Sequence, residues 1–176
     1  RQLFKATGTT VESLGDYVDT GDEALVIDNK LIYEFKDQSD DLGQELYVTS
    51  DGTNFSLIGD VKPGSDDGAI DHLIDFNGAA YFIGGQNDDL YVINNSFDSV
   101  TALTTTVDWG NNLLSSTNFI AGQADVNDSG REVYKYDGNT YALSADFKTT
   151  GNNHGVNKTR AVVGDILFAG ISPDGD

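Results

Sequence analysis

Cysteine and methionine are both absent from this 176-residue chain. Without cysteine the fold has no disulfide bond, and any metal site has to use oxygen or nitrogen ligands. The absence of cysteine fits a bacterial extracellular protein. Because there is no methionine even at the first position and no signal peptide, we expect the sequence to be a mature or excised piece of a longer product.

Basic residues are scarce. Ten Lys and Arg stand against 29 Asp and Glu, which gives a formal net charge of -19. Binding to nucleic acid needs clusters of Lys and Arg, so nucleic acid is excluded as a partner, and an anionic membrane surface is disfavoured for the same reason. No apolar run approaches the roughly 18 residues of a membrane helix, so we expect no membrane insertion. The abundant Asp suits a turn-rich surface, and it also suits calcium or a saline habitat.

The residues of common hydrolytic sites are also few. The three arginines, Arg1, Arg131 and Arg160, are too few for the arginine cluster of a sialidase. A Ser-His-Asp triad would need His72 or His154, and neither lies near a nucleophile motif. No carboxylate pair of a glycosidase is recognisable in the sequence alone. We therefore expect a protein that is not an enzyme.

What the chain does contain is a repeat. One short phrase with an aromatic residue at its third position returns at intervals of 43 or 44 residues. Its four copies are QLFKATG (2–8), ELYVTSDG (45–52), DLYVINN (89–95) and EVYKYDG (132–138), and the aromatic residues are Phe4, Tyr47, Tyr91 and Tyr134. A period of this length built from strand-like runs is typical of propeller blades, so we expect the four aromatic residues to occupy equivalent, largely buried positions between blades.

Each repeat holds four strand-like runs and no segment with a convincing helical period, so we predict an all-β chain. Apolar runs meet at Asn77-Gly78, which is a strong hairpin signal. The predicted fold is a four-bladed β-propeller with four antiparallel strands per blade. The blades are predicted at residues 24–60, 70–105, 113–147, and 160–171 together with 2–16. The shared fourth blade would close the ring by pairing residues 3–6 with 166–169.

Residues 43–82, with ELYVTSDGT, DVKPG and FNGAAYF, resemble the ELWxxDGT-type repeats of bacterial extracellular propellers. Tyr or Phe stands where that family has Trp, and the other three repeats match only in part. The resemblance implies a propeller and a secreted or cell-surface setting, and it carries over no catalytic residue. The run 50–55 is also similar to the Asp-box turn of sialidase-like propellers, which is a structural turn.

A calcium loop is one interpretation of residues 125–132. Oxygen-bearing side chains alternate before a glycine there, as in the first half of an EF-hand loop. The candidate Ca²⁺ ligands are Asp125, Asn127, Ser129 and Glu132. The other interpretation is a long hairpin turn.

Four loops should open at one end of the propeller channel, and propellers commonly bind ligands on such a face. They are residues 17–22, 62–68, 107–112 and 149–154. Trp109 is either an aromatic platform for a sugar or a residue packed between blades. The candidate ligand-binding residues are Asp22, Asp66, Trp109, Asn111, Asn112, Asn152, Asn153 and His154.

The function predicted from these observations is a non-catalytic binding or structural module of a secreted or surface bacterial protein. Its ligand would be a glycan or an extracellular protein. Two other classes stay open: a glycan-processing enzyme, and an assembly subunit of an extracellular polymer. The sequence alone leaves the oligomeric state undefined.

Overall fold

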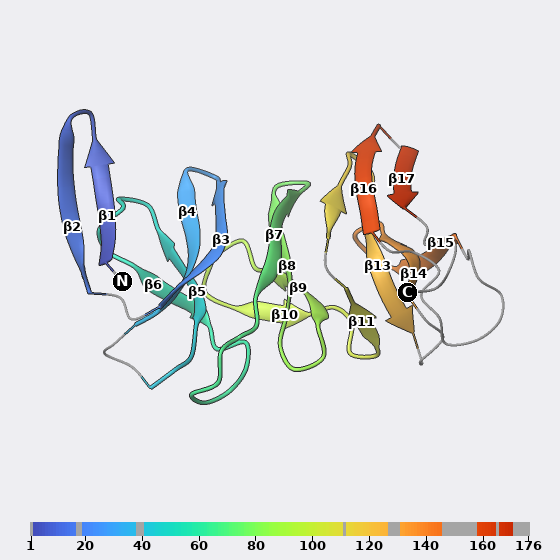
Figure 1. Cartoon of the computed structure of the whole chain (residues 1–176), viewed down its shortest axis with the longest axis horizontal. Coiled ribbons are helices and arrows are strands. Elements are labelled where there is room, and N and C mark those ends of the chain that lie inside the picture. Colours follow the sequence, from blue (N-terminus) through green and yellow to red (C-terminus); the bar gives the residue numbers. More distant parts are fainter. Residues whose placement is uncertain are drawn as a thin grey trace.

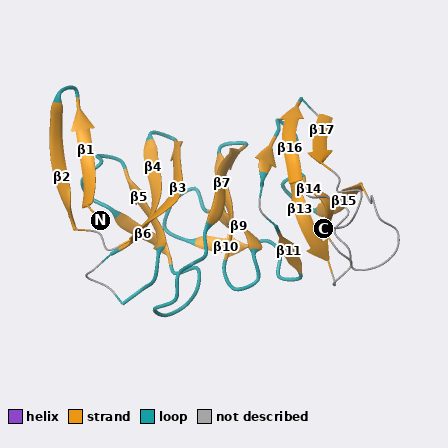
Figure 2. Ribbon diagram, in the orientation of Figure 1, coloured by secondary structure: helices purple, strands orange, loops and turns teal. Residues whose placement is uncertain are grey.

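A computed structural model describes residues 2–16, 19–37, 41–110, 112–126, 131–145, 158–164 and 166–170. These residues form antiparallel β-sheets and no helix, which confirms the prediction of an all-β chain (Figure 2). The described ranges accordingly hold no helical segment suited to crossing a membrane.

The sheets follow one another along the longest axis of the molecule (Figure 1). The first is a hairpin of β1 (Gln2–Thr7) and β2 (Thr10–Asp16). The next sheet, which we call sheet I, has the order β3 (Asp19–Ile27), β4 (Lys30–Lys36), β5 (Glu45–Thr49) and β6 (Ser56–Gly59). Sheet II has the order β7 (Asp71–Phe76), β8 (Ala79–Gly84), β9 (Asp89–Ile93) and β10 (Val100–Ala102).

Sheet III contains β13 (Ile120–Val126), β14 (Arg131–Tyr136) and β15 (Tyr141–Ala145). Two short strands, β11 (Val107–Trp109) and β12 (Leu114–Ser115), pair with different parts of the free edge of β13. A hairpin of β16 (Lys158–Val163) and β17 (Ile166–Gly170) completes the described chain. Sheets I and II are meanders of four consecutive strands, as the repeat pattern predicts for blades.

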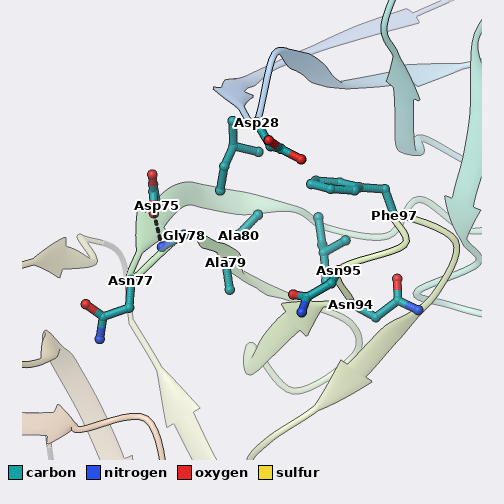
Figure 3. A pocket seen from close by; sticks show the side chains of 11 residues that line it. Asp28, Asp75, Asn77, Gly78, Ala79, Ala80, Asn94, Asn95 and Phe97 are labelled. Atoms are coloured by element: carbon teal, nitrogen blue, oxygen red, sulfur yellow. Dashed lines mark hydrogen bonds between the residues drawn. The ribbon is translucent and has the colours of Figure 1, made fainter.

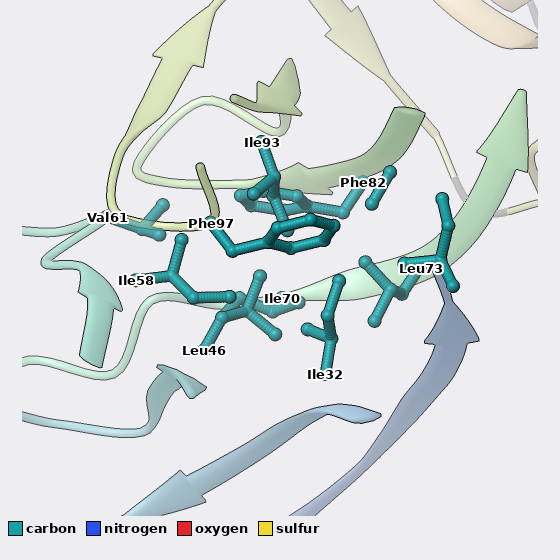
Figure 4. Packing of buried hydrophobic residues seen from close by; sticks show 11 residues of the cluster. Ile32, Leu46, Ile58, Val61, Ile70, Leu73, Phe82, Ile93 and Phe97 are labelled. Carbon is teal, nitrogen blue, oxygen red and sulfur yellow. The ribbon is translucent and has the colours of Figure 1, made fainter. Parts of the chain in front are cut away.

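Sheets I, II and III stack face to face, and β8 shows how. Successive side chains of a strand point to opposite faces of its sheet. Ala80 and Phe82 accordingly belong to a hydrophobic cluster shared with sheet I, whereas Tyr81 and Ile83 belong to a second cluster shared with sheet III. The first cluster also contains Ile32, Leu46, Ile58, Val61, Ile70, Leu73, Ile93 and Phe97 (Figure 4). Sheet II is therefore covered on both faces, which explains the uninterrupted apolar run of β8.

The repeated aromatic residues occupy related positions in the three central sheets. Tyr91 and Tyr134 each pack against the cluster that joins their sheet to the preceding one. Tyr47 is 3% exposed and stacks on Phe35, with 4.1 Å between ring centroids. Burial is confirmed for Tyr47, and Tyr91 and Tyr134 are half-buried. The fourth member, Phe4, is 54% exposed, so the expectation that it is largely buried is wrong for this structure.

The acidic residue at the start of three of the repeated phrases is buried in every case: Glu45 is 0%, Asp89 6% and Glu132 5% exposed. The backbone N–H of Val61 donates to Glu45 Oε2 at 2.9 Å. The carboxylate thereby holds the segment that leaves sheet I towards sheet II. Burial is the main reason that the pKa of Glu45 rises from 4.5 to about 7.

The two terminal hairpins lie at opposite ends of the array in Figure 1. Within the described residues β1 pairs with β2 and β17 pairs with β16, and no pairing joins residues 3–6 to 166–169. The closed four-bladed ring is thus not observed and stays a prediction. The exposure of Phe4 has the same cause, because within the described ranges the main contacts of β1 are with β2 alone.

Candidate functional site

A pocket of about 490 Å³ lies where the chain enters sheet I and where it passes from sheet I to sheet II. We call this end of the array the loop face, because the predicted loops 17–22 and 62–68 were expected to meet there. Five carboxylate side chains and one amide supply its polar lining: Asp22, Glu23, Glu34, Asp67, Asp71 and Gln44. The backbone of Gly21, Ala69 and Ile70 completes the wall, and none of the lining residues is basic.

The segment after sheet I is fixed to the start of β5 by backbone contacts. The N–H of Gln44 donates to Asp67 Oδ1 at 2.9 Å, and the N–H of Gly68 donates to the carbonyl of Gln44 at 2.8 Å. A side chain at Gly43 would collide with the backbone of Asp66 and Asp67, so a glycine is needed there. These contacts hold the Asp67 carboxylate at the rim of the pocket.

Glu34 forms the inner wall of the pocket. It is 5% exposed, and it lies so close to Gly21 that a Cβ there would collide with its carboxylate. Burial is the main reason that the pKa of Glu34 rises from 4.5 to about 7, and the negative charges of Glu23 and Asp71 raise it further. Near neutral pH this carboxyl group is therefore partly protonated.

Two further carboxylates, one from sheet I and one from sheet II, line the pocket. Glu23 of β3 accepts a hydrogen bond from the backbone N–H of Leu73 at 2.9 Å. Burial raises the pKa of Asp71, and nearby His72 opposes this rise. Ala69 and His72 have φ angles of 50° and 55°, which are uncommon for residues other than glycine, asparagine and aspartate. The pocket is thus a concentrated set of oxygen acceptors on a constrained backbone.

Only part of the predicted ligand-binding set lies at this pocket. Asp22 lines it. Asp66 is exposed and pairs with Lys62 at 3.4 Å, and its neighbour Asp67 takes the place in the wall that we expected for Asp66. Asn112 is half-buried between β11 and β12 in the sequence, and it does not line this pocket. The other predicted residues, Asn111, Asn152, Asn153 and His154, lie outside the described residues.

Trp109 is packed between sheets, which is the second of its two interpretations. Its side chain is 1% exposed and belongs to the cluster between sheets II and III. Residues 107–109 form β11 instead of a loop, because buried Val107 and Trp109 alternate with exposed Asp108 along an edge strand. An exposed sugar platform at Trp109 is therefore wrong, because the ring is covered on all sides.

The calcium candidates lie at the hairpin between β13 and β14. Asp125 is half-buried in β13 and opposite Arg131 in the strand register, whereas Glu132 is buried within β14. Asn127 and Ser129 lie outside the described residues. Across the described ranges no three His, Asp or Glu side chains form a group suited to a metal ion.

Sequence reasoning did not single out four of the pocket carboxylates: Glu23, Glu34, Asp67 and Asp71. Glu23 and Glu34 flank the paired residues Ala24 and Tyr33 of the β3–β4 hairpin. The hairpin register, extended from its turn, would therefore have indicated that these two residues lie close together. Asp67 and Asp71 join them only through the path of the chain between sheets I and II, which no local pattern specifies.

Neither the protein-family models nor the curated proteins include a match to this chain. The likeness to ELWxxDGT-type repeats therefore depends on the motifs themselves.

Proposed function

We propose that this protein is a non-catalytic binding module that holds a positively charged segment of an extracellular protein in the loop-face pocket. The setting that fits the sequence is a secreted or cell-surface bacterial protein. The observation that carries the proposal is the pocket lining, in which five carboxylates and one amide converge with no basic side chain among them.

A lysine or arginine side chain complements such a pocket in charge and in hydrogen-bond donors. Burial first, and then the charges of neighbouring carboxylates, raise the pKa of Glu34 and Asp71, so the pocket resists full ionisation. A guanidinium or ammonium group would relieve this repulsion and supply several hydrogen-bond donors to the acceptor-only wall. A net charge of -19 would also steer a basic partner towards the molecule and speed association.

The four-bladed ring is part of the proposal, and the order of the first strands supports it. β3 contacts β7, β7 contacts β12, and β12 contacts β16, so one strand from each sheet follows the next. In a propeller these strands would surround the central channel. Pairing of β1 with β17 would complete the fourth blade and cover Phe4, Val11 and Ile166, which are 54%, 67% and 62% exposed.

The test is titration of the protein with a fluorescent hexalysine peptide and with a Gly-Ser hexapeptide as the neutral control. The Asp22→Asn/Asp67→Asn variant should weaken hexalysine binding about tenfold, which is about 1.4 kcal/mol. The matched control, Glu12→Gln/Asp98→Asn, also removes two exposed acidic charges, and it should change binding little. An equal loss in both variants would assign binding to net charge alone and overturn the pocket.

A glycan-processing enzyme is the second candidate, and one observation favours it. Glu34, with a pKa near 7, shares a pocket with Glu23 and Asp71, and glycosidases combine a protonated with an ionised carboxyl group. Incubation with a panel of neutral oligosaccharides tests this candidate. Hydrolysis that is lost in Glu34→Gln would favour the enzyme over the binding module.

A further inference from the structure

The opposite end of the sheets carries a second set of pockets. Tight turns join the first and second strands of the sheets there, with positive φ at Asp28, Asn29, Asn77 and Gly78. We call this end the turn face. One pocket of about 460 Å³ lies between sheets I and II, and a neighbouring pocket of about 430 Å³ lies between sheets II and III. Asp75 and Asn77 line both, so the two pockets adjoin at the Asn77-Gly78 turn.

The first pocket combines an apolar floor with a polar rim (Figure 3). Side chains of the first hydrophobic cluster reach its floor, and amides and carboxylates stand around it. The floor comes from Ile27, Ala79, Ala80, Ile93 and Phe97, and the rim from Asp28, Asp75, Asn77, Asn94 and Asn95. Such a mixture suits a sugar, whose C–H face is apolar and whose edge carries hydroxyl groups.

Several rim groups are available to a ligand. Asp75 uses Oδ1 to accept the N–H of Gly78 at 3.0 Å, which leaves its second oxygen for another donor. The side-chain amides of Asn77 and Asn95 are exposed and make no hydrogen bond with the described part of the chain. An amide offers both a donor and an acceptor, as a hydroxyl group requires.

The charge of this pocket differs from that of the loop-face pocket. Lys30 Nζ lies 3.3 Å from Asp28 Oδ2 and 4.5 Å from the centre of the Phe97 ring. It thereby offsets one of the two rim carboxylates, and Asp75 is the other. Amides and hydroxyl groups dominate the rest, including Ser115, Ser116 and Thr117 of the neighbouring pocket. This balance favours a neutral ligand over a cation.

The floor is also held in a preformed shape. Phe97 has φ of 59°, which is a strained conformation for a bulky residue. Its N–H donates to the carbonyl of Asn94 at 3.0 Å, and Asn94 Oδ1 accepts the N–H of Asp98 at 3.0 Å. These bonds keep the ring buried beneath the rim, so a ligand would bind without ordering the loop first.

We propose that the two adjoining pockets of the turn face bind a neutral oligosaccharide, with Asp75, Asn77 and Asn95 as the hydrogen-bonding residues. Each pocket falls within the size range of small-molecule sites, so the pair spans more than one sugar unit. This site differs from the proposed loop-face site in residues, charge and ligand. An experiment can therefore refute either proposal and leave the other standing.

The experiment uses the whole chain and three probes: maltopentaose, cellopentaose and mannopentaose. Titration calorimetry in 50 and 500 mM NaCl should show that at least one binds with little effect of salt. Asn95→Ala and Asp75→Asn should each weaken that binding at least tenfold, and Asp22→Asn at the loop face should leave it unchanged. Asp75→Asn retains an acceptor for the Gly78 N–H, so it should preserve the turn.

Amide chemical shifts give a second measurement on the unmodified protein. The bound oligosaccharide should shift the signals of Gly78, Ala79 and Gly164, which surround the two pockets. Failure of all three probes to bind at millimolar concentration would overturn the proposal. So would binding that is lost in Asp22→Asn, or shifts confined to the loop face.

Discussion

The buried carboxyl groups predict that this protein loses stability as the pH rises from about 4.5 to 7. Glu34 and Glu45 both have a pKa raised from 4.5 to about 7, chiefly by burial. Below 4.5 each is protonated in the folded and in the unfolded chain. Above 7 each is ionised in both, and the folded chain then contains two buried negative charges. The stability is therefore greatest below the unfolded pKa and is lost as the pH passes through the folded one.

The magnitude follows from the size of the shift. One pKa unit corresponds to 1.36 kcal/mol, so a rise from 4.5 to about 7 gives an upper limit of roughly 3 kcal/mol for each group. Structural relaxation and nearby water lower this limit at buried sites, and about 1 to 2 kcal/mol for each is the expected effect. The raised pKa of Asp71 and Asp89 acts in the same direction.

Urea denaturation at pH 5, 6, 7 and 8 measures the effect. The unfolding free energy of the unmodified protein should fall by roughly 2 to 4 kcal/mol across this series. Glu34→Gln/Glu45→Gln should lose most of this slope and keep only the smaller contribution of groups such as Asp71 and Asp89, because glutamine does not titrate and can still accept the Val61 N–H. Glu12→Gln, an exposed control, should keep the full slope. A double variant with the same slope as the unmodified protein, or a stability that rises with pH, would refute the reasoning.

Three other predictions concern single positions. Tyr47→Ala should cost about 3 to 5 kcal/mol in urea denaturation, because it removes a buried ring stacked on Phe35; a loss below about 1 kcal/mol would place the ring at the periphery. Ala69→Gly should stabilise the protein by about 1 kcal/mol, because Ala69 has φ of 50°, and an unchanged midpoint would show that the backbone there is relaxed. Millimolar CaCl₂ should raise the melting temperature more than NaCl of equal ionic strength, and Asp125→Ala should abolish the difference; equal effects of both salts would assign the stabilisation to screening.

The sequence predicts the strands well, because strand signals are local. Asn77-Gly78 has the positive φ angles of a tight hairpin turn, and Asp51 Oδ1 accepts the N–H groups of Thr53 and Asn54, as in an Asp-box turn. Of the residues that line the loop-face pocket, the sequence predicted only Asp22 as a binding residue. Its deepest carboxylate, Glu34, lies inside a strand, where a charged residue normally indicates an exposed position, and only the packing of sheet II against sheet I makes it buried.

The position of Trp109 could not be predicted from local sequence. A lone tryptophan between aspartate and glycine is compatible with a loop or with an edge strand, and the choice depends on β13, which lies more than ten residues away. The prediction that Phe4 is buried is wrong for a related reason, since its burial requires a sheet from the other end of the chain. Long-range contacts decide both positions, and a repeat pattern that predicts a shared fourth blade does not by itself determine whether the two ends pair.

The four-bladed ring is the central claim of the proposed architecture, in which the loop face and the turn face would be the two ends of the channel. The chain has no cysteine, so Ala6→Cys/Ile166→Cys can be spin-labelled at two sites only and measured by pulsed dipolar spectroscopy, diluted with unlabelled protein. In the closed ring these positions are cross-strand neighbours with Cβ atoms about 5 Å apart, and the labels should lie at the short limit of the method. Labels separated by most of the length of the array in Figure 1 would contradict the ring.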